Sequence, residues 1–405
     1  MKKIVLSALA ALTLGSVAAS AGIIKLYQDG NGQVFTKPAE GRTEIKADTP
    51  VFAKASKLKF SGLTYIGFNY TNYDATLSNG TVNTRSDITQ FEIRRAYFQL
   101  KAYLLDNPKS YYRITFDVHQ DSKINGDTTD GDILLRVKYA YLYLDSVLPN
   151  TGVEVGVVHR PWHDYEEHTS WYFRDISKVL VEQKNGANLS NSADFGFNFK
   201  TKTKYFDSEL GLFNGEGYHS TQISSDMSFE WRTTAHILGV NGKDKEKKLT
   251  YWDASFFGQY NKSHKGIDTN SDGVNDRFDD LIFYGLHTVY NQPKFLVAAQ
   301  YIKSLDTADN GTYVSKQAGE GYSVNAEYRL GNTNDYRALV RYDSWTPTVL
   351  AGPEYEQKTY IAGIAWDQNK NIEWVANIDI TDNAAGSRRE SYNATAYMLT
   401  TQVKF

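Results

Sequence analysis

The chain contains no cysteine, only three methionines and only eight prolines among its 405 residues. Without cysteine, a disulfide framework, a thiol nucleophile and a cysteine-ligated zinc site are all excluded. After the first 21 residues, no segment approaches the roughly 18 consecutive apolar residues of a membrane-spanning helix. The formal net charge is −3, so the chain lacks the excess of basic residues that is typical of nucleic-acid-binding proteins. We therefore expect neither a transmembrane helix nor a nucleic-acid partner.

Residues 1–21 have the pattern of a secretory signal peptide. They combine a positive start at Lys2 and Lys3, an apolar run over residues 4–17 and a small-residue cleavage site at residues 19–21. We expect this segment to be removed on export and exclude it from the prediction of the fold.

Aromatic residues are abundant, with 29 tyrosines, 20 phenylalanines and 7 tryptophans. The mean hydropathy is nevertheless −0.49. An exported chain that is polar on average yet rich in aromatic residues has two common explanations. It is a secreted β-protein, or it is an outer-membrane β-barrel whose hydrophobicity is hidden in the alternation along each strand.

The final segment, "YNATAYMLTTQVKF", alternates with a period of two residues up to Phe405. Tyr397 and Leu399 share one face with Phe405, whereas Thr400 and Gln402 lie on the other. An edge strand of a soluble sandwich is the alternative interpretation. In this feature, however, the sequence resembles bacterial outer-membrane barrels, which typically finish on an amphipathic strand with a terminal phenylalanine. The resemblance implies recognition of Phe405 by the barrel-assembly machinery.

The same alternation recurs along the chain. Near Val340, for instance, one face is apolar and the other carries Arg337 and Arg341, which is too charged for a protein core. Because short turns also alternate with long loops, we predict an all-β fold: a transmembrane antiparallel up-and-down β-barrel of about 16 strands over residues 57–405. The expected strands are 57–71, 88–104, 110–120, 132–144, 151–159, 192–202, 205–214, 228–241, 250–261, 279–290, 294–303, 320–330, 334–343, 357–367, 371–380 and 391–405.

Residues 22–56 precede the first predicted strand. Within them, "LYQDGNGQVF" has the pattern of a small hairpin. We expect a periplasmic N-terminal extension and assign it no role.

Three internal stretches make the resemblance more specific: "FEIRRAYFQLKAYLLDNP", "RVKYAYLYLDSVLPNTGVEVG" and "HRPWHDYEEH". In these the sequence resembles the sixteen-stranded porins of Gram-negative bacteria. It is most similar to those of epsilonproteobacteria and, more distantly, to the phosphate-selective porin family. The resemblance implies an outer-membrane protein in contact with lipid bilayer and lipopolysaccharide, and a homotrimer. It also implies that the third long loop, residues 160–191, folds into the barrel and narrows it.

The third loop is rich in charged residues and histidines, which are suited to setting the size and charge of a constriction. Acidic groups at Asp164, Glu166 and Glu167 would face a wall of basic residues and create a transverse field across the pore. The alternative is that the loop charges pair with one another and hold the loop in place. The candidate residues of the constriction loop are Arg160, His163, Asp164, Glu166, Glu167, His168 and Arg174, with Lys178 nearby.

The basic wall is predicted from strand alternation. If Phe98 and Leu100 face outward, the cations on either side of them point into the lumen. Arg136 and Lys138 on the predicted strand 132–144 also point inward if Tyr139 and Tyr141 face lipid. The candidate residues of this wall are Arg95, Lys101, Arg113, Arg136 and Lys138.

The histidine-rich stretch matches no catalytic motif. His159 and His163 stand four residues apart, but Pro161 between them disfavours the helix that would align them. His163, Glu167 and His168 give H-x-x-x-E-H, one residue away from the zinc pattern H-x-x-E-H. No G-x-S-x-G motif occurs. We expect no enzyme and no required cofactor.

A further motif, "DTNSDGVNDRFDD", begins at Asp268 and has the spacing of a calcium-binding loop. It departs from that pattern at its twelfth position, which is aspartate rather than the longer glutamate. A solvated surface loop is the alternative. If Ca²⁺ binds, it would rigidify an outer loop, and the candidate ligands are Asp268, Asn270, Asp272, Asp276 and Asp279.

Together these features predict a porin in the cell outer membrane that passes small hydrophilic solutes and ions by passive diffusion. Two alternatives remain. A substrate-specific channel for an anion such as phosphate would need several lumenal arginines on one track. A surface-contact or adhesin barrel can be narrow or plugged, and it would use its outer loops.

Overall fold

The computed structural model describes residues 27–30, 33–44, 55, 57–120, 133–218, 226–240, 249–267, 277–306, 318–348, 355–387 and 389–405. The chain divides into two compact units, Met1–Lys54 and Ala55–Phe405. In the first unit, β1 (Tyr27–Asp29) pairs antiparallel with both β2 (Val34–Phe35) and β3 (Arg42–Glu44). The hairpin expected around "LYQDGNGQVF" is therefore present as β1 and β2.

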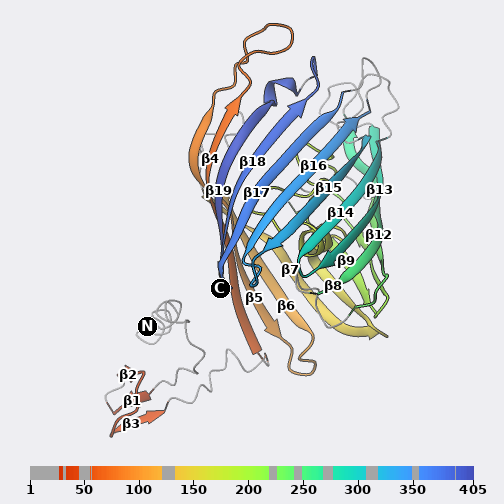
Figure 1. Ribbon diagram of the computed structural model, residues 1–405. Helices are drawn as coiled ribbons and strands as arrows, with labels where there is room; N and C mark the ends of the chain where they lie inside the picture. The colour runs from red at the N-terminus through yellow and green to blue at the C-terminus, as the bar shows by residue number, and fades with distance from the viewer. Residues whose placement is uncertain are drawn as a thin grey trace. The chain divides into compact units, whose positions relative to one another are not determined.

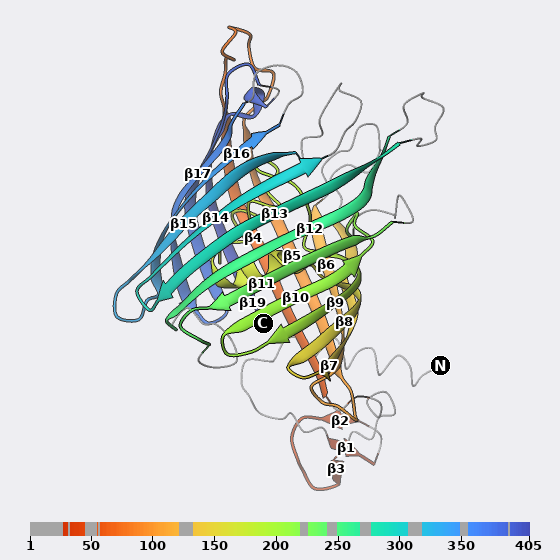
Figure 2. The same ribbon diagram turned by 90° about the vertical axis from the view of Figure 1, so that its right-hand side faces the viewer.

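The second unit is a closed barrel of sixteen antiparallel strands, β4 to β19 (Figures 1 and 2). Each strand pairs with its neighbours in sequence, and β19 pairs with β4 to close the circle. The predicted fold class and strand number are confirmed. The strands are β4 (Lys57–Tyr73), β5 (Ile88–Tyr103), β6 (Tyr111–Gln120), β7 (Ile133–Leu148), β8 (Thr151–His159), β9 (Ala193–Lys202), β10 (Phe206–Phe213), β11 (Ser228–His236), β12 (Tyr251–Ile267), β13 (Arg277–Gln292), β14 (Phe295–Asp306), β15 (Gly319–Leu330), β16 (Tyr336–Pro347), β17 (Gln357–Asn369), β18 (Ile372–Asn383) and β19 (Ala394–Lys404).

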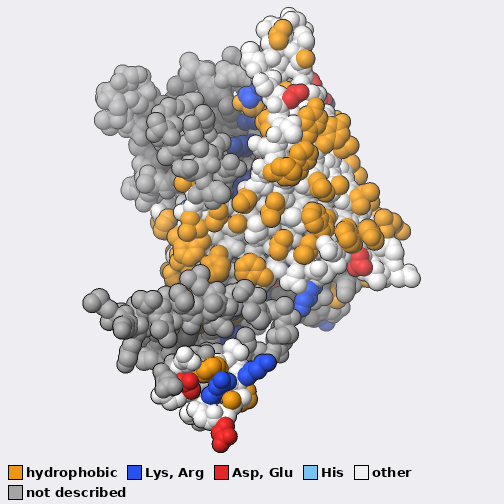
Figure 3. All heavy atoms as spheres, turned by 90° about the vertical axis from the view of Figure 1, so that its left-hand side faces the viewer, with side chains coloured by type: hydrophobic (Ala, Val, Ile, Leu, Met, Phe, Trp, Pro, Cys, Tyr) orange, Lys and Arg blue, Asp and Glu red, His pale blue; other side chains and the backbone are white. Residues whose placement is uncertain are grey.

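The barrel is apolar outside and polar inside. On β19, Tyr397 and Leu399 are 48% and 47% exposed on the outer face, whereas Thr400 and Gln402 are buried on the inner face. Figure 3 shows apolar side chains spread over the outside of the barrel. This is the inverse of a soluble domain, and it follows from the period-two pattern seen in the sequence.

Among the described helices, none has the length and apolar character needed to cross a membrane.

The pairing of β19 with β4 continues as far as Phe405. Gly62 and Phe405 exchange two backbone hydrogen bonds of 3.0 and 3.1 Å. A Cβ added to Gly62 would lie 2.2 Å from the Cζ atom of Phe405. The absence of a side chain at Gly62 therefore makes room for the terminal aromatic ring.

Two β-bulges change the direction of side chains that simple alternation predicts. Arg94 is the extra residue where β5 pairs with β4, and Lys138 is the extra residue where β7 pairs with β6. Such an inserted residue shifts the alternation of the strand by one position. Tyr139 and Tyr141 are consequently 5% and 1% exposed and face the lumen. The prediction that these two tyrosines face lipid is wrong.

Candidate functional site: a charged cavity inside the barrel

The connection between β8 and β9 spans residues 160–192 and contains the seven-residue helix α2 (His163–Thr169). Its apolar side chains form one buried cluster with inward-facing residues of β12, β13, β14 and β16 to β19. Trp162, for example, stacks on Phe257 of β12 with ring centroids 3.7 Å apart and planes 3° apart. The buried apolar residues of the segment are Trp162, Tyr165, Trp171, Phe173, Ile176, Val179, Leu180, Val181, Ala187 and Leu189.

Backbone carbonyls of the same segment accept hydrogen bonds from inward-facing side chains of several strands. Asn325 of β15 donates to the carbonyl of Ser170 at 2.7 Å, and Arg341 of β16 donates to that of Lys178 at 2.8 Å. On the other side of the barrel seam, Arg94 of β5 donates to the carbonyl of Ile176 at 3.2 Å. These bonds satisfy loop carbonyls that would otherwise be buried without partners.

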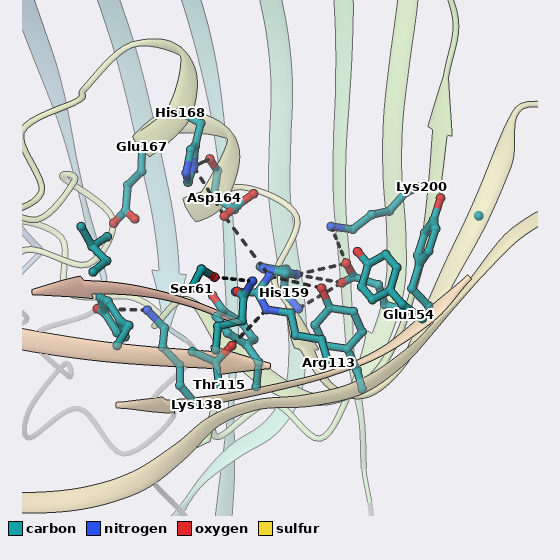
Figure 4. Close-up of a pocket in the computed structure, with 18 of the residues that line it drawn as sticks. Ser61, Arg113, Thr115, Lys138, Glu154, His159, Asp164, Glu167, His168 and Lys200 are labelled. Carbon is teal, nitrogen blue, oxygen red and sulfur yellow. Dashed lines mark hydrogen bonds and ion pairs between the residues drawn. The ribbon is translucent and has the colours of Figure 1, made fainter. Parts of the chain in front are cut away.

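A cavity of about 900 Å³ lies between this segment and the strands on the opposite side, mainly β4 to β9 (Figure 4). Its lining extends to Asn150 in the β7–β8 turn and to Lys404 next to the C-terminus. Charged residues and tyrosines dominate the lining. The ionisable residues other than tyrosine are Arg113, Lys138, Asp145, Glu154, His159, Asp164, Glu167, His168, Arg174, Lys200, Lys202, Glu373 and Lys404.

Four of the seven predicted loop residues line this cavity: Asp164, Glu167, His168 and Arg174. Arg174 pairs with Glu167 at 2.6 Å and with Glu182 at 3.3 Å. Figure 4 shows Asp164, Glu167 and His168 on the loop side of the cavity. Part of the loop charge is therefore paired within the loop, as the alternative interpretation expected, and part faces the cavity.

The other three loop candidates lie away from the cavity lining. Arg160 is buried and pairs with Asp194 at 2.9 Å and Glu230 at 3.1 Å. His163 contacts the carbonyl of Ser190 at 3.3 Å, and burial lowers the pKa of its imidazole to about 4. These contacts tie the start of the loop to β9 and β11 and to the end of the loop itself.

Glu166 is the third of these residues, and it points toward the strands that hold the loop. It accepts a hydrogen bond of 2.7 Å from Nε1 of Trp162 and another from Nε2 of Gln300 on β14. Burial raises the pKa of Glu166 to about 8, while Arg341 acts in the opposite direction. Glu166 thereby links α2 to β14 and lies outside the cavity lining.

The five candidates for the basic wall all lie on β5, β6 and β7, and they differ in their partners. Arg95 and Arg136 both pair with the buried Asp117, at 2.7 and 3.0 Å. Lys101 lies over the ring of Tyr111, 4.4 Å from its centroid. Of the five, Arg113 and Lys138 line the cavity.

The sequence did not lead us to predict a charged cluster on β8 and β9, formed by Glu154, His159 and Lys200. Nδ1 of His159 lies 3.0 Å from Glu154, and Nζ of Lys200 lies 3.1 Å from the same carboxylate. Nε2 of His159 lies 3.2 Å from Nη1 of Arg113 (Figure 4). Glu154 alternates with valines in "TGVEVGVVH", and this alternation is the signal that could have placed it in the lumen.

Among the described residues, no group of three or more histidines and carboxylates is arranged to hold a metal ion. The predicted calcium ligands Asp268, Asn270, Asp272 and Asp276 lie outside the described residues. Asp279 falls within β13, but its side chain is not among those described. The calcium site stays a prediction.

Comparison with known proteins finds similarity in structure and none in sequence. No protein-family model matches the chain, and no curated protein matches it. The anion-selective porin from Comamonas acidovorans aligns with a TM-score of 0.59 at 11% identity, over 86% of this chain and 99% of that one. In-vitro folded OmpT, an outer membrane protein of Vibrio cholerae, gives 0.57 at 11% identity, over 87% and 100%. OmpF of Salmonella typhi gives 0.56 at 12% identity, over 88% and 99%. At this level of identity the likeness establishes the fold, which is that of sixteen-stranded bacterial outer-membrane barrels.

Proposed function

We propose that the protein is a porin of the Gram-negative outer membrane that passes small hydrophilic solutes and ions by passive diffusion. The observation that carries the proposal is the charged cavity of about 900 Å³ inside a closed barrel with an apolar outer face. An apolar outer band matches a bilayer, and a charged interior matches water and dissolved ions. The proposed role is transport, with no catalytic step.

In this proposal, the segment 160–192 sets the width of the channel. Its apolar contacts with β12 to β14 and β16 to β19 support a fixed position, and its charged residues support a polar passage on the side of β4 to β9. Asp164 and Glu167 would meet solutes on one side, and Arg113 and Lys138 on the other. Such opposed charges favour dipolar solutes over apolar ones.

We further propose a homotrimer, with lipid and lipopolysaccharide around the assembly and Phe405 as the recognition signal for assembly. One solved form of the Vibrio cholerae OmpT barrel is a trimer, which supports this oligomeric state. The exposed ring of Phe405 also ends a regular amphipathic strand.

Planar-bilayer recording of the refolded protein tests the proposal. We expect stepwise, ohmic conductance at neutral pH, and a reversal potential in a salt gradient that reports the net effect of the two charged sides. Steps in groups of three would support the trimer. Absence of conductance from protein that migrates as a folded barrel on unheated gels would overturn the porin and favour the surface-contact alternative.

A further inference from the structure

The strand wall of the cavity carries two cations that lack acidic partners. Among the described residues, no ion pair joins Arg113 or Lys138 to a carboxylate, in contrast to Arg95 and Arg136, which share Asp117. Nε of Arg113 donates to Thr115 at 3.0 Å, and Nη1 donates to the hydroxyl of Tyr141 at 3.3 Å. No hydrogen bond within the described chain uses Nη2 of Arg113, which leaves this donor for a solute.

Lys138 has a similar environment. Its ammonium group donates to the hydroxyl of Tyr97 at 3.3 Å, and the centroid of the Tyr97 ring is 4.6 Å away. An ammonium group has three N–H donors, so this bond leaves two for a solute. Contact with tyrosine rings stabilises a cation without neutralising its charge.

One tyrosine ring lies close to both cations. The centroid of the Tyr139 ring is 4.7 Å from Cζ of Arg113 and 5.4 Å from Nζ of Lys138. The two charges are therefore at most about 10 Å apart, and all three residues line the same cavity. Figure 4 shows Arg113 and Lys138 on the strand side, facing the loop that carries Glu167.

Three carboxylates that line the cavity have partners other than Arg113 and Lys138. Glu154 is paired with His159 and Lys200, and Glu167 is paired with Arg174. Asp164 lies on the opposite, loop side, with its nearest ionisable partners at His168 and His159. Arg113 and Lys138 therefore keep their charge available to an anion, although Asp164 and Arg113 both lie near Nε2 of His159.

We propose that Arg113 and Lys138, which both contact the ring of Tyr139, form a lumenal binding site for short dicarboxylates. A four-carbon dicarboxylate extends about 6 Å between its outermost oxygens. With a charge-assisted hydrogen bond of about 2.8 Å at each end, it can bridge two donors up to about 11 Å apart, which covers the upper limit for this pair. The inference rests on the proposed channel function and names a solute class for it.

A length series of acids tests the site in the unaltered protein. Isothermal titration calorimetry of the detergent-folded barrel would compare acetate, malonate, succinate, suberate and inorganic phosphate. We expect succinate or malonate to bind at least about tenfold more tightly than acetate, because the second charged hydrogen bond is absent from acetate. We also expect suberate to bind less tightly than succinate, because its longer chain must fold to bring both carboxylates within this distance. Phosphate that binds as tightly as succinate would contradict a preference for dicarboxylates.

Two variants and one matched control locate the site. Arg113→Gln and Lys138→Met each remove one of the two cations and should bring succinate down to the affinity of acetate. Lys202→Met removes a cavity-lining cation that is exposed and remote from Tyr139, and it should leave the preference for succinate intact. Folding of each variant is checked by its heat-dependent migration on gels.

The outcomes separate the site from the channel. If the protein conducts but binds acetate, succinate and suberate alike, the dicarboxylate site is wrong and the porin stands. If Lys202→Met weakens succinate as much as Lys138→Met does, the preference comes from general lumenal charge, and the site is again wrong. If succinate binds selectively to protein that does not conduct, the channel function fails and the binding site remains.

Discussion

The indole ring of Trp162 lies flat on the phenyl ring of Phe257, with centroids 3.7 Å apart and planes 3° apart. This contact joins the start of the third long loop to β12. The cavity lies on the other side of the loop, next to β4 to β9. Both side chains are buried, Trp162 at 3% exposure and Phe257 at 0%. The apolar packing of the loop against the strands therefore begins immediately before α2 and continues to Leu189.

Truncating this anchor should loosen the loop. We expect Trp162→Ala to lower the free energy of unfolding by about 3–5 kcal/mol, which is typical of an aromatic residue removed from a core. In the proposed channel it should also produce larger and noisier conductance steps. Thermal melting and bilayer recording measure the two effects. Trp366→Ala, which removes the same ring from the outer face at 39% exposure, is the control and should leave conductance unchanged. Equal conductance in the two variants would contradict the role of Trp162.

The buried carboxyl of Glu166 predicts a pH dependence of stability. Burial raises its pKa in the folded protein to about 8, whereas an unfolded glutamic acid titrates near 4.3. The folded state therefore binds an extra proton between these two values. The contribution of protonated Glu166 to the free energy of unfolding is fully present below about pH 4. This contribution is lost as the pH rises to about 8. Glu166→Gln keeps a neutral hydrogen-bonding group at every pH, so its melting temperature should fall less between pH 5 and pH 8 than that of the unaltered protein.

Melting curves of the detergent-folded protein at pH 5, 6.5 and 8 measure this difference. Asp106→Asn is the control, since it removes a carboxyl from the exposed turn between β5 and β6. If the unaltered protein and Glu166→Gln lose melting temperature in parallel, Glu166 is already ionised in the folded state and the prediction is wrong.

The sequence predicted the barrel well because alternation is a local property. Each strand from β4 to β19 overlaps a segment predicted from alternation, and such a segment needs only its own residues to be recognised. The same reasoning failed at Tyr139 and Tyr141. The bulge at Lys138 is set by pairing with β6, so the residues of β7 alone do not reveal it.

The site was predicted less completely for a related reason. Glu166 and Glu167 are neighbours in sequence, yet one is buried against Gln300 and the other lines the cavity beside Arg174. The helix α2 turns them in different directions, and the packing of the segment against the strands decides which direction faces the lumen. Similarly, nothing in the sequence shows that Arg95 is paired with Asp117 while Arg113 is not, because these partners lie on different strands.

Arg160 holds the loop to the barrel through buried ion pairs. Its guanidinium group contacts Asp194 at 2.9 Å and Glu230 at 3.1 Å, and all three side chains are buried. Arg160→Met would leave two buried carboxylates without their cation, which typically costs about 3–5 kcal/mol. We expect a marked loss of thermal stability. Lys109→Met removes a cation from the exposed pair with Asp145 and should have little effect.

A second variant separates loss of the charge from loss of packing. Asp194→Asn combined with Arg160→Met removes one of the stranded carboxylates, so it should recover part of the stability. Melting curves of the single and double variants measure the coupling between the two residues. If Asp194→Asn lowers the melting temperature as much in the Arg160→Met background as in the unaltered protein, the two residues act independently. The ion-pair explanation would then be wrong.

The contact between Gly62 and Phe405 predicts that a side chain at position 62 would clash with the terminal ring. A Cβ at Gly62 would lie 2.2 Å from the ring of Phe405, which is closer than packed carbon atoms approach. Gly62→Ala should therefore displace the terminal ring and reduce the fraction of protein that refolds into a heat-modifiable barrel. Phe405→Ala removes the ring and leaves the backbone bonds to Gly62 available. In that background Gly62→Ala should cause no additional loss, because the clash is gone. If Gly62→Ala is equally harmful with and without the ring, its effect arises from the backbone of β4, and the steric explanation is wrong.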